Sequence, residues 1–201
     1  LQAVAAKEGA KLGIVDLKSK TWYLPTSKNQ RDHTIHLSDF ALEQLCSLAK
    51  AREIVSTSRG DEFSSEPDEV SPWVFPATDN RKPVCVKSFG KQLADRQREG
   101  EDRMTNRTKA TTALKLPGGR WTAHDLRRTA ATVMARCGFG SDTINECLNH
   151  IQADRMARVY IQDRREADQV RAFDALGAQL QKLVSGQQTP SNVVELPMTG
   201  T

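Results

Sequence analysis

The chain has 201 residues, a length typical of one domain with or without a tail. Hydrophobic residues make up 38% of the chain and charged residues 27%, which supplies a core and excludes a wholly disordered protein. No apolar run is long enough to cross a membrane, the first ten residues do not resemble a signal peptide, and the net charge of +4 permits a polyanionic partner without requiring one.

Three short β-strands are predicted near the N-terminus, over residues 14–17, 21–25 and 33–37. Polar turns separate them, and this close spacing favours a small antiparallel sheet. Ser38 or Asp39 then stands where it can cap a helix over 40–54, whose apolar residues recur at helical spacing. Residues 58–72 have the composition of a surface loop.

The rest of the chain is predicted to be helical. Helices are expected over about 84–99, from Thr122 or Ala123 to the G-F-G at 138–140, from a cap at Ser141 through 142–150, over a short stretch ending at Tyr160, and over about 164–184. The residues from 185 are rich in Gln, Thr, Pro and Gly and are predicted to form a disordered tail. The fold class is therefore α+β, with a small sheet followed by many helices.

No metal or cofactor is predicted. The four cysteines are scattered without a C-x-x-C pair, so we expect reduced thiols in a cytosolic protein and no zinc site. They are Cys46, Cys85, Cys137 and Cys147. His33 and His36 lie three residues apart, but a metal needs further ligands and none is evident.

The helix that begins near Thr122 concentrates its charge at its start. An apolar stripe shares one face of it and comprises Leu126, Ala130, Val133, Met134 and Cys137. Arg127 lies beside this stripe, so we expect it to be partly buried, and His124 is its neighbour one turn earlier. Both are near the end of the helix where free backbone N–H groups favour an anion. The pattern indicates a phosphate site; a surface helix with a basic first turn is the alternative.

Two further residues add to this pattern. His150 follows the short helix in the stretch C-L-N-H, and Tyr160 comes ten residues later; a tyrosine hydroxyl attacks phosphorus when the phosphate is held and its charge is matched. The ordered set His-x-x-Arg, Leu-x-His and Tyr resembles the catalytic domain of the tyrosine recombinases, the phage integrase family, and in particular prophage and genomic-island integrases. A weaker resemblance covers residues 15–45 and the stretch W-V-F-P-A at 73–77.

The resemblance implies a role for five residues. Arg127 binds the scissile phosphate, His124 assists proton transfer, His150 donates to a phosphate oxygen, Tyr160 is the nucleophile, and Lys28 protonates the departing 5′ oxygen. On residue type alone, other roles stay open: a solvated lysine at position 28, a helix-capping histidine at 150 and a core tyrosine at 160. Tyr23, the other tyrosine, is expected to be structural.

The resemblance also implies the reaction and the partners. A covalent 3′-phosphotyrosine would form and be reversed by a 5′ hydroxyl of a second duplex, without ATP, metal or cofactor. The expected partner is double-stranded DNA at attachment sites. The protein would form a homotetramer on this DNA, be weakly associated or monomeric without it, and act in the bacterial cytoplasm at the nucleoid. The C-terminal helix would close its own domain or pack on a neighbour. An inactive DNA-binding remnant and a type IB topoisomerase-like nicking enzyme are the alternatives.

Two departures from the family pattern stand out. The family places its first arginine before the first strand, and no arginine precedes Ile14 here. Because the chain also lacks an initiator Met, we expect residues 1–184 to be an N-terminally truncated catalytic domain, inactive or weakly active alone. His36 stands where the family often has proline, and its effect is expected to stay at the strand end.

Overall fold

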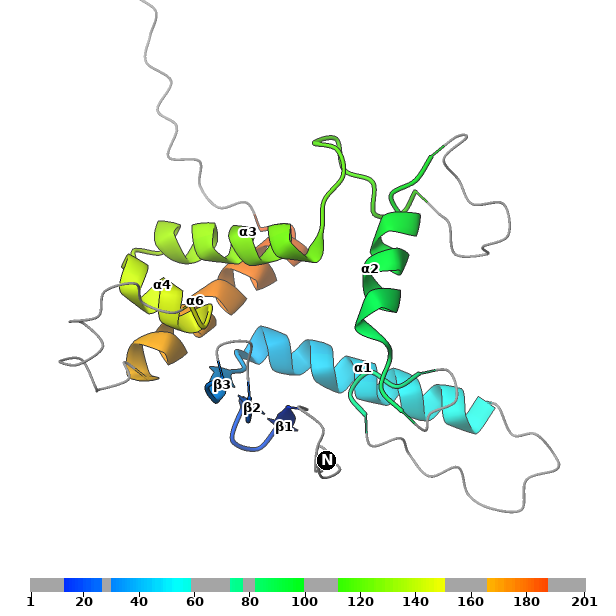
Figure 1. The fold of residues 1–201 in the computed structure, drawn as a ribbon, viewed down its shortest axis with the longest axis horizontal. Helices are drawn as coiled ribbons and strands as arrows, with labels where there is room; N and C mark the ends of the chain where they lie inside the picture. Colours follow the sequence, from blue (N-terminus) through cyan, green and yellow to red (C-terminus); the bar gives the residue numbers. More distant parts are fainter. Residues whose placement is uncertain are drawn as a thin grey trace, which may run out of the picture.

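The computed structural model describes residues 13–26, 30–58, 73–77, 82–99, 112–150 and 166–187. In chain order its elements are β1 (Ile14–Asp16), β2 (Thr21–Leu24), β3 (His33–His36), α1 (Asp39–Ser58), α2 (Val86–Asp95), α3 (Ala123–Arg136), α4 (Ser141–Cys147) and α6 (Glu166–Val184). Figure 1 shows the small sheet beside the start of α1, with α3, α4 and α6 grouped at one side. The α+β class predicted from the sequence is confirmed.

The three strands form one antiparallel sheet in the order β1-β2-β3. Trp22 is the central pairing position, opposite Val15 on one side and Ile35 on the other. Each strand ends one residue earlier than predicted. Pro25 has no N–H to continue the ladder of β2, and Leu37 gives its N–H to the carbonyl of Lys20, 2.8 Å away, as the chain turns into α1.

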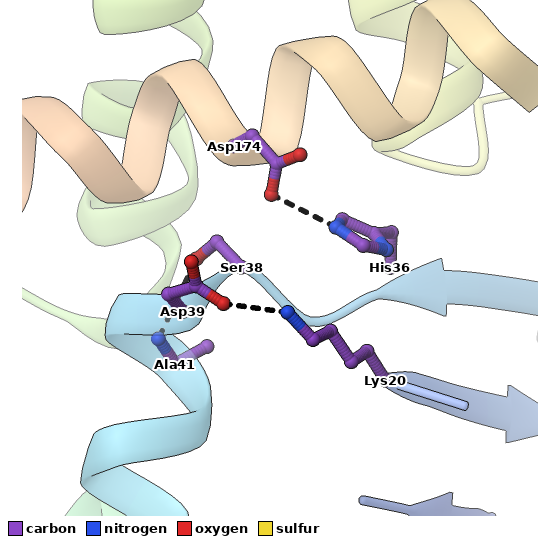
Figure 2. Close-up of polar contacts among 6 residues, drawn as sticks. All are labelled: Lys20, His36, Ser38, Asp39, Ala41 and Asp174. Carbon is purple, nitrogen blue, oxygen red and sulfur yellow. Dashed lines mark hydrogen bonds and ion pairs between the residues drawn. The ribbon is translucent and has the colours of Figure 1, made fainter. Parts of the chain in front are cut away.

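Of the two cap residues predicted from the sequence, Ser38 and Asp39, Ser38 caps α1. Its hydroxyl accepts the N–H of Ala41 at 3.4 Å and its carbonyl accepts that of Leu42 at 2.9 Å. Asp39 lies in the first turn, where a carboxylate suits the helix dipole. Figure 2 shows the Lys20 ammonium reaching it, 2.7 Å away, which lowers the pKa of Asp39 and raises that of Lys20. The helix continues to Ser58, four residues beyond the predicted end.

The buried core lies between α3, α4 and α6. One residue from each helix is almost fully buried: Met134, Cys147 and Ala172. Phe139, Ile144, Phe173 and Leu176 pack against them. Burial raises the pKa of the Cys147 thiol to about 11. The predicted stripe of α3 holds at Met134 but not at Leu126, which is 54% exposed one turn from the start of the helix.

The C-terminal helix α6 is anchored on the sheet and on α1. Gly177 is buried and lies against Ser38 at the start of α1. One turn earlier, Asp174 meets the imidazole of His36, with Nε2 and Oδ1 2.8 Å apart (Figure 2). The expectation that His36 matters only at its strand end is therefore wrong, because its ring joins β3 to a helix 138 residues away in sequence.

A buried glutamine connects α2 to the segment before α3. The helix α2 spans only Val86–Asp95, shorter than the predicted 84–99, because Cys85 is extended and the chain turns after Asp95. In this turn the Gln97 amide donates to the carbonyls of Leu93 and Trp121, at 3.0 and 2.9 Å, and accepts the Trp121 N–H at 2.8 Å. Gln97 therefore fixes the chain where it enters α3.

Some predicted elements cannot be compared with the structure. The loop of 58–72, the short helix ending at Tyr160 and all but the first three residues of the tail from Ser185 lie outside the described residues. Within the described part of the chain, no helix has the length and apolar character needed to cross a membrane.

Candidate functional site

The first turn of α3 is closed by its own acidic residue. Thr122 is the extended N-cap residue, and Asp125 Oδ2 accepts both its backbone N–H at 3.0 Å and its hydroxyl at 2.9 Å. These hydrogen bonds lower the pKa of Asp125, with smaller contributions from Arg128 and His124. The predicted start of the helix is confirmed. The capping hydrogen bonds between Thr122 and Asp125 fix the direction in which the chain enters α3, whose first turns carry the basic residues.

The end of α4 is a Schellman motif, a helix stop in which the chain turns through a left-handed residue. Asn149 has φ 52° and gives its N–H to the Glu146 carbonyl at 2.9 Å, while the His150 N–H bonds the Asn145 carbonyl at 2.8 Å. Asparagine is one of the few residues that adopt this conformation readily. The motif fixes where His150 leaves the helix. At the other end of α4, Gly140 and not the predicted Ser141 occupies the N-cap position, because Ser141 is already helical.

The side chain of Arg127 joins these two helix ends. Its Nη2 donates to the carbonyl of Leu148, the C-cap residue of α4 and two residues before His150. A carbonyl in the last turn of a helix lacks a partner within that helix, so a guanidinium is a suitable donor for it. The expectation that Arg127 is partly buried is wrong: the side chain is exposed, because it reaches along the surface from α3 to α4.

The imidazole of His150 is held by Asn145. Its Nδ1 lies 3.0 Å from the side-chain oxygen of Asn145. The other ring nitrogen, Nε2, is not engaged by this contact. His150 is exposed, so a large ligand has access to it. Asn145 was not among the residues selected from the sequence. The pattern that could have indicated it is an asparagine five residues before a histidine, with a second asparagine where the helix stops.

The structure thus places Arg127, one of the five residues selected from the sequence, beside the chain segment that carries a second, His150. Arg127 and the segment that carries His150 are joined by a hydrogen bond. His124 is exposed on the first turn of α3, three residues before Arg127. Lys28 and Tyr160 lie outside the described residues. Among the residues whose structure is described, no three His, Cys, Asp or Glu side chains gather as a metal site.

Comparisons with known proteins bear on the family. The model of the phage integrase family matches residues 7–167, a range that includes all five selected residues. Searches among curated proteins and among solved structures gave no match. Since the match covers most of the chain, the chain belongs to the phage integrase family of DNA-binding tyrosine recombinases.

Proposed function

We propose that residues 1–184 form the catalytic domain of a site-specific recombinase that cuts and rejoins DNA during integration or excision of a mobile element. The observation that carries this proposal is the hydrogen bond from Arg127 to the Leu148 carbonyl. It sets a guanidinium from the start of α3 next to the segment that presents His150 at the end of α4. Two cationic or hydrogen-bonding groups on an exposed surface are what a DNA phosphate requires.

The guanidinium has donors to spare for a phosphate. Arg127 carries five N–H groups in a planar fork, and the Leu148 carbonyl takes up one at Nη2. The remaining donors are enough for a bidentate contact with two phosphate oxygens. The carbonyl contact restricts the guanidinium before DNA arrives, so less side-chain freedom is lost when the phosphate binds.

The proposed reaction conserves the phosphodiester. The hydroxyl oxygen of Tyr160 bonds to phosphorus and gives up its proton, with His124 assisting that transfer. The bond from phosphorus to the 5′ oxygen breaks, and Lys28 supplies a proton to that oxygen. Arg127 and His150 offset the charge on the phosphate oxygens. A 5′ hydroxyl then attacks the phosphotyrosine, which rejoins DNA and restores the tyrosine.

The assembly and location are part of the proposal. The substrate is double-stranded DNA at attachment sites, and a homotetramer would hold two duplexes during strand exchange. A protein acting on chromosomal and mobile-element DNA would work at the bacterial nucleoid.

The first test is formation of a covalent protein–DNA complex. The chain is incubated with a pool of nicked duplexes whose central sequence is randomised, and products are separated on a denaturing gel. We expect a weak, slowly migrating band with the wild-type chain and with Tyr23→Phe, the matched control in β2. Tyr160→Phe should give no band. DNA retention without any covalent band would favour the inactive DNA-binding alternative. Relaxation of a supercoiled plasmid without paired sites would favour the topoisomerase-like one.

The second test uses the geometry of the guanidinium. Arg127→Lys keeps the positive charge, but one ammonium cannot donate to the Leu148 carbonyl and also form a bidentate phosphate contact. We expect covalent complex formation to slow by about 10²–10³-fold. Arg128→Lys, one residue on and 74% exposed, is the matched control and should stay near the wild-type rate. Equal effects of the two substitutions would contradict the role given to Arg127.

A further inference from the structure

We propose that Asn145 is a positioning residue that determines which ring nitrogen of His150 is available to the DNA phosphate. This inference rests on the proposed function, because it assigns His150 a phosphate contact. It concerns a residue that the family resemblance did not select. Asn145 makes two hydrogen bonds to His150 at the end of α4.

Asn145 holds both the backbone and the ring of His150. The Schellman motif bonds the His150 N–H to the Asn145 carbonyl at 2.8 Å, which fixes the Cα of the histidine relative to the helix. The Asn145 side-chain oxygen lies 3.0 Å from Nδ1 and fixes the ring about its side-chain torsions. One residue thus restrains the histidine at two points.

The side-chain contact also assigns a proton. A carboxamide oxygen only accepts hydrogen bonds, so the Nδ1 facing it carries a hydrogen. Nε2 is then the nitrogen left for a ligand, and it donates to a phosphate oxygen when the ring carries both protons. Without Asn145 the ring would be free to rotate and to adopt the Nε2–H form that a solvated neutral imidazole prefers.

The position of Arg127 gives this choice a purpose. Its guanidinium is tied to the Leu148 carbonyl, two residues before His150 along the same turn. A phosphate bound by Arg127 therefore arrives beside the turn that carries the imidazole. With Nδ1 occupied by Asn145, Nε2 is the nitrogen that can reach that phosphate.

The direct test is the protonation pattern of the His150 ring, which requires no activity. Long-range ¹H–¹⁵N NMR spectra of the ¹⁵N-labelled chain distinguish the two neutral tautomers. We expect the Nδ1–H form in the wild-type chain and in Asn145→Asp, which keeps an acceptor. We expect the Nε2–H form to dominate in Asn145→Leu, which has a similar size but no acceptor. A wild-type ring in the Nε2–H form, or a spectrum that Asn145→Leu leaves unchanged, would overturn the inference.

The same variants are then compared in single-turnover covalent complex formation at saturating DNA. Asn145→Leu is expected to slow the reaction by about 10–100-fold, the size of effect found when the partner that orients a metal-bound histidine is removed. Asn145→Asp should stay near the wild-type rate. Circular dichroism melting curves check that each variant is folded. If Tyr160→Phe abolishes the band but Asn145→Leu reacts like wild type, the inference fails and the proposed function stands. If the band persists in Tyr160→Phe, the proposed function fails, and the phosphate role of His150 fails with it.

Discussion

Replacing Gly177 with alanine tests the close contact between α6 and the start of α1. Gly177 is buried in α6, opposite the start of α1. A Cβ atom added there would lie 2.3 Å from the Ser38 hydroxyl oxygen, 2.6 Å from the Ser38 Cβ and 3.5 Å from the Phe40 Cβ. The first two separations are shorter than any real contact of a methyl group, so α6 or the start of α1 has to move.

Two opposing effects decide the result. In an open helix the change from glycine to alanine stabilises by about 1 kcal/mol, because alanine has the higher helix propensity. Here the methyl group needs about 1 Å more room to reach a normal carbon–carbon separation of about 3.5–4 Å. Overpacking of this kind costs about 1–3 kcal/mol or more. The Ser38 Cβ is fixed to a capped backbone and cannot rotate away, so we expect a net loss of about 1–2 kcal/mol in the free energy of unfolding.

The assay is urea unfolding followed by circular dichroism, with two control variants. Gly90→Ala lies inside α2, where an added Cβ meets nothing within 4 Å, and should stabilise by about 0.5–1 kcal/mol. Adding Ser38→Gly to Gly177→Ala removes both clashing atoms, and glycine is itself an acceptable N-cap, so the double variant should recover most of the loss. If Gly177→Ala raises the midpoint as Gly90→Ala does, the close packing of α6 on α1 is refuted.

Three further predictions concern buried and capping groups. Gln97→Leu leaves the backbone N–H and carbonyl of Trp121 without their amide partners, so urea midpoints should show a loss of about 1–3 kcal/mol, and a neutral result would contradict the bridging role of Gln97. The hydrogen bonds from Thr122 lower the pKa of Asp125, so the unfolded chain binds this proton more readily than the folded chain. The stabilisation of the folded state by ionised Asp125 is therefore present above the unfolded pKa of about 3.9 and is lost as the pH falls through the lower folded pKa. Urea midpoints at pH 5, 4 and 3 should therefore fall less steeply in Asp125→Asn, and equal slopes would exclude the capping bonds as the cause. Cys147 is buried with a pKa of about 11, so iodoacetamide at pH 8 should label exposed Cys46 first and Cys147 only on unfolding, as peptide mass spectrometry will show; early labelling of Cys147 would contradict its place in the core.

Local chemistry made several elements predictable. Two helix starts carry a clear local pattern. Ser38 precedes an apolar helical repeat, and Thr122 is followed three residues later by Asp125; α1 and α3 begin directly after these two residues. Gly138 ends α3 with φ 90°, as a glycine after a helical run indicates. Pro25 ends β2 for an equally local reason, because it has no N–H for the ladder; the strand therefore stops at Leu24, one residue before its predicted end.

The contacts between distant segments were not predictable in this way. His36 and Asp174 are 138 residues apart, and nothing near either residue indicates the other. The helical wheel placed Arg127 beside the apolar stripe and so predicted partial burial, but it says nothing of where a long side chain ends. The side chain instead extends along the surface, and its guanidinium donates to the Leu148 carbonyl. The residue types of the site could be recognised from local sequence pattern. Its shape could not, because it depends on contacts between distant segments.

The candidate site lies where one helix begins and another ends, and backbone hydrogen bonding explains this placement. A helix start leaves N–H groups unpaired and a helix end leaves carbonyls unpaired. Near such a pair of ends, one arginine can bind a carbonyl of the protein while keeping donors for an anion. The Arg127–Leu148 contact holds only while α3 and α4 keep their relative position, which the shared core at Met134, Cys147 and Ala172 maintains. Loosening that core would separate the guanidinium from the turn that carries His150. Phosphate binding and stability should therefore change together for core substitutions and separately for Asn145.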